Sequence, residues 1–516
     1  MVATAGVVVV CSVILPLVSA TVRVVSGAAR SSPLSTGAPG LGAGTWRLLI
    51  SSIGWSALIA TLSTVFACAA AWTLWRAGRV ARAALVAPLL VPSTLAFAGW
   101  GLLRAPDTWL GAWLEQAAQH GWHEAPVVAG RLLAVLGLSL WACPLGAIVI
   151  WSGLRATDPT LIESLRADGA SPFRIARELA RLCRGDILRA AGVVALVMLG
   201  SAVPLHLSQV ETLAIQVWFA LDNLPREQQW RAWAAAWPLV AIAVGAGWWI
   251  GGQGARFDPG EARGSGGATK RRDLVAGAIP WTLGVVVPLG LFIANIGHAS
   301  ALSRFWENNS GAIARSLETA ATVSAGTLVL GLATGWALSL RGFWAGLASL
   351  TTRLSLISGL LPGVLIGSAM SGLVIAADSA WLEDSLLPVI GAHLARFGFL
   401  GALAGCWGAN AARRLTGDPA RLDGADGWAG WWRASLWPVF GVHLAAAGAA
   451  GILSLHEIEA TVQVMPPGDC LARVILGDLH YSRVADMSAA GIWLLGAGLL
   501  PVLAVALWGT WRRGPE

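Results

Sequence analysis

Long apolar runs without charge constrain the fold of this chain more than any other feature of its sequence. Several reach about 18 residues or more, the length that a helix rising about 1.5 Å per residue needs to cross about 30 Å of hydrocarbon. Of 516 residues, 56% are hydrophobic and 12% are charged, about half the charged share of an average soluble domain. This composition cannot supply the polar surface of a soluble fold, so we expect an all-α membrane protein.

About twelve apolar segments are long enough to be considered as membrane spans, which predicts about twelve transmembrane helices. They lie roughly at 2–22, 48–74, 83–103, 127–152, 189–205, 232–252, 274–296, 313–340, 347–375, 386–409, 439–455 and 487–511. An even number of spans places both termini on the same side of the membrane.

The distribution of positive charge predicts that this common side is the cytoplasm. About two thirds of the 35 Lys and Arg residues lie in loops that this orientation makes cytoplasmic. Many of the 29 Trp residues stand near the ends of apolar segments, as interfacial anchors do. No basic stripe with interleaved aromatic residues occurs, so we expect membrane lipid, and no nucleic acid, as a partner.

The first apolar segment has two interpretations. Val18-Ser19-Ala20 has the small-x-small pattern of a cleavage site after an apolar stretch, which predicts a signal peptide. No positively charged residue precedes the segment, however, and the second half of the chain has a counterpart at 274–296. We favour a retained span, and cleavage would leave the orientation of everything downstream unchanged.

The two halves of the chain resemble each other beyond hydropathy. Ser52–Trp72 aligns without gaps to Ser316–Trp336, and the next apolar run of each half contains proline, at Pro88 and Pro92 and at Pro362. Six spans per half would make the repeat parallel, with its axis along the membrane normal and a substrate path between the halves.

This repeat predicts two transmembrane domains joined by a linker. The first domain covers 1–252, with its core at about 48–252, and the second covers 274–516, with its core at about 313–511. Residues 253–273 are Gly-rich and polar, as flexible cytoplasmic linkers are.

A polar loop containing Asp-Gly-Ala follows the fourth apolar segment of each half. In the first loop, Pro159 to about Ala167 is predicted to form a short helix with Asp158 as its N-cap. Gly169 is expected to end this helix, and Ser171-Pro172 to start a second amphipathic stretch that continues to Leu182. The same tripeptide recurs in the second loop as Asp423-Gly424-Ala425.

These two loops resemble the EAA loop of binding-protein-dependent ABC importer permeases of the type I class, whose pattern is Glu-Ala-Ala, three residues and Gly. Glu163 and Gly169 occupy the Glu and Gly positions, while Ser164-Leu165 replaces the two Ala. In the second loop Gly424 matches the Gly, but Asp418 stands where the Glu is expected.

The resemblance implies the type I ABC importer transmembrane fold, with a separate ABC ATPase dimer docking on loops 158–182 and 418–438. The implied docking residues are Glu163, Asp168, Gly169, Ala170, Asp418, Asp423, Gly424 and Ala425.

A second resemblance concerns the segment from Glu457 to Gly468 and the later Leu479-His480-Tyr481. Together they resemble the outer loop of fused two-domain permeases for ferric iron or thiamine. This likeness implies a bacterial inner membrane, a periplasmic or lipid-anchored binding protein, and ferric iron or, second, thiamine as cargo. Sulfate, molybdate and polyamines stay open.

Three ionisable residues, His456, Glu457 and Glu459, follow the eleventh apolar segment and are candidates for the outer mouth of the path. The alternative is that they are ordinary charges in the hydrated interface. Within the same apolar segment, His443 is expected to make a satisfied contact between helices.

No catalytic or metal-binding pattern occurs: HExxH and GxSxG with partners are missing, and the six Cys lack metal-ligand spacing. We therefore expect no enzyme activity, cofactor or metal in this chain, and the function that the motifs imply is that of an ABC importer permease. An ion-coupled secondary carrier is the alternative, although the spans are poor in the acidic and Lys residues that couple ions. The degenerate second loop leaves a non-transporting permease homologue as a third hypothesis.

Overall fold

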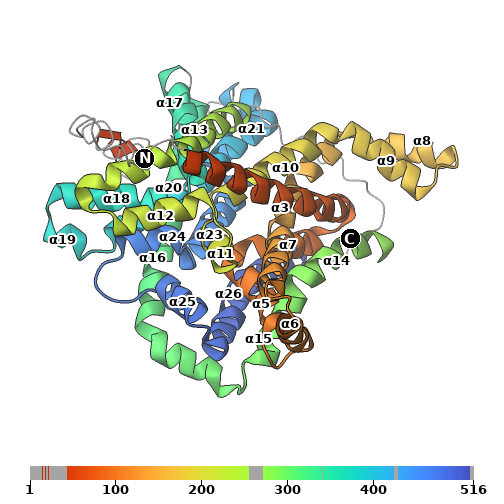
Figure 1. Ribbon diagram of the computed structural model, residues 1–516. Coiled ribbons are helices and arrows are strands. Elements are labelled where there is room, and N and C mark those ends of the chain that lie inside the picture. Colours follow the sequence, from red (N-terminus) through yellow and green to blue (C-terminus); the bar gives the residue numbers. More distant parts are fainter. Residues whose placement is uncertain are drawn as a thin grey trace.

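The computed structural model describes residues 14–15, 18, 21–22, 43–254, 271–340, 342–422 and 428–511, which form helices and turns with no strand among them (Figure 1). Most of the predicted span at 2–22 and most of the linker at 253–273 therefore lie outside the described residues.

The helices before the linker have the following bounds: α3 Ala43–Arg76, α4 Arg79–Val86, η2 Ala87–Leu90, α5 Ser93–Gly101, η3 Leu102–Arg104, α6 Trp109–Gln119, α7 Ala125–Ala156, α8 Pro159–Ala167, α9 Pro172–Leu182, α10 Arg184–Leu199, α11 Val203–Leu207, α12 Leu213–Asn223, η4 Arg226–Gln228 and α13 Gln229–Gly254.

Those after the linker are α14 Arg271–Trp281, η5 Thr282–Val286, α15 Val287–Asn295, α16 Ser300–Ser339, α17 Phe343–Leu360, α18 Gly363–Ala377, α19 Ala380–Glu383, α20 Leu387–Phe397, α21 Phe399–Leu422, α22 Trp428–Trp431, η6 Trp432–Leu436, η7 Trp437–Val439, α23 Phe440–Leu455, α24 Glu459–Val464, α25 Leu471–His480 and α26 Val484–Trp511.

Within the described residues, seven helices are long and apolar enough to cross a membrane. They are Gly44–Arg76, Ala125–Ala156, Gln229–Gly252, Leu274–Asn295, Ser300–Ser339, Trp437–Leu455 and Val484–Ala504. Three further helix pairs pass the same test together, although each is bent at a break, which raises the number of candidate spans to 10. The chain is thus an all-helical, multi-pass membrane protein.

The predicted segment at 189–205 is not among these candidate spans. Its helix, α10, has 16 residues and ends at Leu199, where Gly200 is the C-cap. The chain then turns at Ser201 and restarts as the five-residue α11, in which Pro204 stands at the start. A break of helical hydrogen bonding therefore divides an apolar run that hydropathy alone reads as continuous.

Proline produces the two sharpest bends, in the third apolar segment of each half. Val80–Leu90 and Ser93–Arg104 meet at 84°, and Phe343–Leu360 and Gly363–Ala377 meet at 109°. Val91 and Leu361 have extended backbones, because the proline that follows each of them, Pro92 or Pro362, disfavours the helical conformation. The predicted proline interruptions are confirmed as breaks, and each leaves backbone groups that need partners in the interior.

The helices of the two halves pack in matching pairs. In the first half α3, α7 and α10 pack against one another, and in the second half α16, α21 and α23 do the same. Ser52 Oγ accepts the N–H of Leu213 at the start of α12 (2.8 Å), and Ser316 Oγ accepts the N–H of Leu471 at the start of α25 (2.9 Å). The two serines that the sequence alignment pairs thus each hold the start of a later helix.

The halves are also interlocked. Helix α13 packs on α17 and α26 packs on α4, while α14 and α15 lie against α3 and α5 of the first half. The largest hydrophobic cluster contains buried side chains of both halves, among them Leu213, Ala243, Leu361 and Val364. The core therefore lies between the halves as well as within them, and it surrounds the second proline break.

Candidate functional site

The first Asp-Gly-Ala loop forms a helix pair, α8 and α9, that projects away from the bundle (Figure 1). Helix α8 begins after Asp158, whose Oδ1 accepts the N–H of Thr160 (2.9 Å). It ends before Gly169, which has a φ of +73°, a conformation that glycine adopts without strain. Ser171 Oγ then accepts the N–H of Arg174 (3.3 Å) and caps α9. The predicted short helix with its caps is confirmed.

The helix pair has an apolar inner face and a polar outer face. Ile162, Ile175 and Leu179 are buried in one hydrophobic cluster that also contains Ile150 and Leu154, near the end of α7. Glu163, Asp168 and Gly169 are exposed, while Ala170 is half-buried. Two large apolar side chains on α9, Phe173 (79% exposed) and Leu182 (58% exposed), also face outward. The pair therefore offers an exposed polar surface with apolar side chains beside it, as a helix that docks on a partner does.

The second loop differs from the first over its described parts. Asp418 lies within α21, which continues as a helix to Leu422, and the side chain of Asp418 is not described. Asp423, Gly424 and Ala425 lie outside the described residues. After them, Trp431 and Leu436 are buried against α16, where the rings of Trp431 and Trp336 meet edge to face at 5.1 Å.

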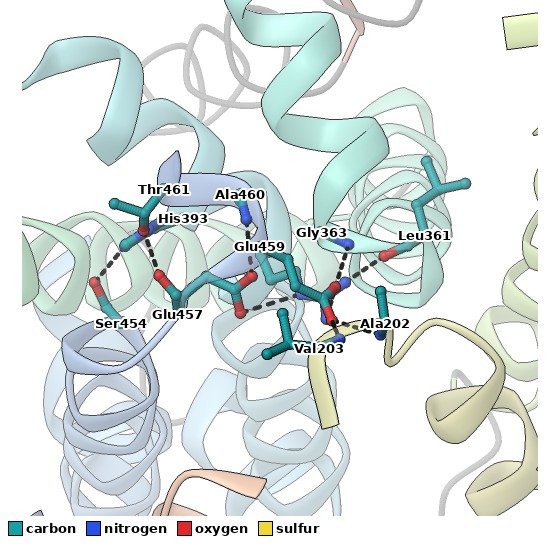
Figure 2. Close-up of polar contacts among 11 residues, drawn as sticks. Ala202, Val203, Leu361, Gly363, His393, Ser454, Glu457, Glu459, Ala460 and Thr461 are labelled. Carbon is teal, nitrogen blue, oxygen red and sulfur yellow. Dashed lines mark hydrogen bonds and ion pairs between the residues drawn. The ribbon is translucent and has the colours of Figure 1, made fainter. Parts of the chain in front are cut away.

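A buried cluster of three charged side chains lies where the halves meet (Figure 2). Arg396 on α20 is 3.4 Å from Glu457, measured between Nε and Oε2, and 3.9 Å from Glu459, measured between Nη2 and Oε2. The Arg396 guanidinium also donates from Nη1 to the carbonyl of Leu361, which the break before Pro362 leaves without a helical partner. One arginine thus hydrogen-bonds to the carbonyl at the break and pairs with both carboxylates.

The Glu459 carboxylate is bound by backbone N–H groups of both halves. Its Oε1 accepts the N–H of Ala202 (2.6 Å) and of Val203 (3.3 Å), at the start of α11. Its Oε2 accepts the N–H of Gly363 (3.2 Å), the first residue of α18. Each of these partners is a donor, so the carboxylate is held in an arrangement that suits its ionised form.

Charge balance in the cluster depends on these N–H groups. Two carboxylates face one guanidinium, and the starts of helices carry partial positive charge that offsets the excess negative charge. Burial raises the pKa of the Glu459 carboxyl, while Arg396 opposes that rise. The cluster is an ionic network in which loss of Arg396 would leave both carboxylates without their cation.

His393, also on α20, is hydrogen-bonded through both ring nitrogens. Nδ1 lies 2.7 Å from Ser454 Oγ and Nε2 lies 2.8 Å from Thr461 Oγ1. Thr461 donates its hydroxyl hydrogen to the carbonyl of Glu457, so its oxygen accepts from His393. His393 therefore carries its hydrogen on Nε2 and accepts from Ser454 on Nδ1, which ties α20 to the segment that holds the two glutamates.

Of the three candidate outer-mouth residues, two are buried and His456 is half-buried. Glu457 and Glu459 are buried, at 8% and 6% exposure. His456 places Nε2 3.3 Å from the carbonyl of Leu90, beside the first proline break, and burial lowers its pKa to about 4. A neutral imidazole that donates to this carbonyl fits both observations.

One member of the cluster, Arg396, and its neighbour His393 were not singled out from the sequence. Arg396 and His393 lie in the apolar segment at 386–409, and an ionisable residue inside a span is itself a signal of a functional position. Their spacing of three residues on one helix was a further signal that they share a face. His443 differs from its prediction, because Nδ1 bonds only to Val439 within its own helix (3.3 Å) and Nε2 has no partner.

Comparisons of the chain with protein-family models, with curated proteins and with solved structures found no match. Among the described residues, no group of three or more His, Cys, Asp or Glu is placed to hold a metal ion. What the chain can do is therefore inferred from the α8–α9 pair and from the buried charge cluster.

Proposed function

We propose that this chain is the permease subunit of an ATP-driven importer in a bacterial inner membrane, with both termini in the cytoplasm. The two halves would form a path for a solute and open it alternately to each side. A separate ABC ATPase dimer would hydrolyse ATP, and a periplasmic or lipid-anchored binding protein would deliver the solute. The chain itself would be no enzyme and hold no cofactor.

The observation that carries this proposal is the projecting α8–α9 pair. Its exposed face includes Glu163, Asp168 and Gly169, and its buried face is fixed to α7 by Ile162 and Ile175. A helix pair that is capped at both starts and anchored on one side can transmit force as a unit, because little of a push on it is lost in local bending.

The matching of the two halves gives further support. Equivalent helix pairs, equivalent proline breaks and the equivalent bonds of Ser52 and Ser316 are what a duplicated six-helix unit predicts. Twelve spans in two parallel repeats are the arrangement that we propose, in which α10 and a span at 2–22 complete the first unit.

Ferric iron or thiamine as cargo rests on the likeness of residues 457–468 to outer loops of permeases for those solutes. Glu457 and Glu459 are committed to Arg396 and to backbone N–H groups in this conformation. Recognition of a cation by these carboxylates would therefore require the cluster to open.

A test of the proposal changes the exposed face of the α8–α9 pair. Glu163→Arg combined with Gly169→Arg should reduce co-purification with an ABC ATPase, and ATP-driven uptake in proteoliposomes, at least tenfold. Glu115→Arg, an exposed glutamate on α6, is the matched control and should leave both unchanged. Undiminished ATPase binding and uptake in the double variant would remove the basis for docking on α8–α9.

An ion-coupled carrier remains the second candidate, and the buried Arg396, Glu457 and Glu459 are the observation that favours it, because coupling carriers use buried charges. Uptake by the purified chain alone, driven by an ion gradient and indifferent to ATP, would establish this function over the first.

A further inference from the structure

The segment from His456 to Gln463 contacts the first half at three places. His456 meets the carbonyl of Leu90, Glu459 meets the N–H groups that start α11, and Gln463 Nε2 donates to Asp222 Oδ1 on α12 (2.9 Å). Glu459 and Gln463 are four residues apart on α24, the spacing that brings side chains to one side of a helix, and His456 lies in the turn that joins α23 to α24.

Glu457 and Thr461 of the same segment make their hydrogen bonds and ion pairs only within the second half. Glu457 accepts the N–H of Ala460 (3.2 Å) and pairs with Arg396, and Thr461 bonds to His393. The two glutamates, two residues apart, therefore have different roles. Glu459 bridges the halves, whereas Glu457 stabilises the second half internally.

The bridge also joins the ends of two equivalent helices. Helix α10 starts beside the α8–α9 pair and ends at Leu199, three residues before Ala202. Helix α23 follows the second loop and ends at Leu455, four residues before Glu459. A helix of 16 residues is about 24 Å long, so each helix reaches from a loop to the bridge.

We propose that the contacts of His456, Glu459 and Gln463 form a latch that holds the two halves together at the ends of α10 and α23 remote from the loops, with the Glu459 carboxylate as its main bond. In the closed arrangement, the carboxylate satisfies three backbone N–H groups that would otherwise be unpaired in the interior. Displacement of α10 or α23 by a loop separates Glu459 from Ala202 and Val203 and opens the halves at this end. The use of the latch in transport rests on the proposed function, but its existence as a contact between the halves does not.

Two substitutions separate the latch from the charge cluster around it. Glu459→Gln replaces an acceptor oxygen by an amide nitrogen facing N–H donors, so it should weaken the contact with the first half. Glu457→Gln is the matched control, because its carboxylate has the same chemistry and the same arginine partner but bonds only within the second half.

The measurement is the distance between spin labels at Glu211 and Asp469, which are exposed and stand two residues before α12 and α25. The full chain would be labelled in nanodiscs after replacement of its six native cysteines, without ATP, ATPase or solute. Glu459→Gln should raise the long-distance fraction at least threefold, and Glu457→Gln should leave it near that of the unsubstituted chain.

Gln463→Ala keeps the test decisive if Glu459→Gln does not fold, because it removes one exposed bond of the same latch. It should shift the distances in the same direction by a smaller amount. Unchanged distances in Gln463→Ala and in any folded Glu459→Gln protein would overturn the latch, as would an equal shift in Glu457→Gln. Undiminished ATPase binding and uptake in the Glu163→Arg, Gly169→Arg variant would instead count against the proposed function, so the two failures are distinguishable.

Discussion

The two proline breaks have the same backbone geometry but are completed by different side chains. In the first half, the carbonyl of Val91 accepts the indole N–H of Trp141 (2.7 Å). In the second half, the equivalent carbonyl of Leu361 accepts from the guanidinium of Arg396. The indole satisfies its carbonyl with one neutral hydrogen bond. The arginine brings a charge into the interior and therefore requires carboxylates beside it. The second half thereby gains an ionic network that the first half does not need.

The two loops also differ, and here it is the first half that has the more exposed structure. The first loop forms the projecting pair α8 and α9 with an exposed Glu163, and the described parts of the second loop are packed onto the bundle through Trp431 and Leu436. The first half therefore carries the more exposed loop and the second half the charge cluster. The halves pack alike but differ in their side chains. We therefore expect them to contribute differently to the proposed transport mechanism.

The largest expected difference between the halves concerns the partners of the two breaks. Arg396→Leu leaves Glu457 and Glu459 without their cation and should cost about 3–5 kcal/mol of unfolding free energy. Trp141→Phe removes one hydrogen bond and should cost about 1–2 kcal/mol. Denaturant titration in nanodiscs checks both values, and equal losses would show that the charge network adds nothing to the second break.

The next largest expected effect is a dependence of stability on pH, caused by Asp478 of α25. This carboxyl is buried, its Oδ2 has no hydrogen-bond partner, and Arg483 approaches Oδ1 only to 3.9 Å. Burial, with a smaller contribution from Asp486, raises the pKa of Asp478 to about 6 from an ordinary 3.8. The folded state thus holds a proton that the unfolded chain releases, and stability falls as pH rises from about 4 to about 6.

Asp478→Asn should remove this loss, because asparagine does not ionise. The variant should be more stable than the unsubstituted chain by about 2 kcal/mol at pH 7.5 and nearly equal to it at pH 4. Thermal unfolding at both pH values measures the difference, with Asp469→Asn, an exposed carboxylate near the start of α25, as the control. A gain of the same size at pH 4 would point to a cause other than ionisation.

Ser52 and Ser316 test how alike the halves are. Each accepts the N–H of a buried leucine, so Ser52→Ala and Ser316→Ala should each cost about 1–2 kcal/mol. Their effects should add in the double variant to within about 0.5 kcal/mol, because the sites share no partner. Ser310→Ala, on the exposed side of α16, is the control. A large loss at one serine and none at the other would contradict their equivalence.

Local features of the fold were predictable because their causes are local. Asp158, Gly169 and Ser171 specify the start and stop of short helices through their own side chains and backbone, and Pro92 and Pro362 break helices wherever they lie. Hydropathy likewise located the candidate spans that the described residues show. It also predicted a span at 189–205, which the structure divides by a break between α10 and α11.

The buried charge cluster was not predictable in the same way. Ala202 and Glu459 are 257 residues apart, and their bond exists only because α10 and α23 end at the same place. Neither composition nor periodicity records such a meeting. From their position beside a span, Glu457 and Glu459 can only be interpreted as candidates for the outer mouth or as ordinary charges in the hydrated interface. Arg396 was the missing partner, and an arginine inside an apolar segment requires a buried acid or a route to water.

The smallest effect concerns the turn between α8 and α9, which has no described counterpart in the second half. Gly169 has a φ of +73°, and a methyl group on its α-carbon would meet no atom within 4 Å. Gly169→Ala should therefore cost about 1 kcal/mol through backbone strain alone, confined to the helix pair. Gly185→Ala, in the first turn of α10 with equally open surroundings, should be neutral or slightly stabilising. Hydrogen exchange of α8 and α9 measures the difference, since faster exchange only in Gly169→Ala would show that this turn, and not helix propensity, holds the first loop in its projecting form.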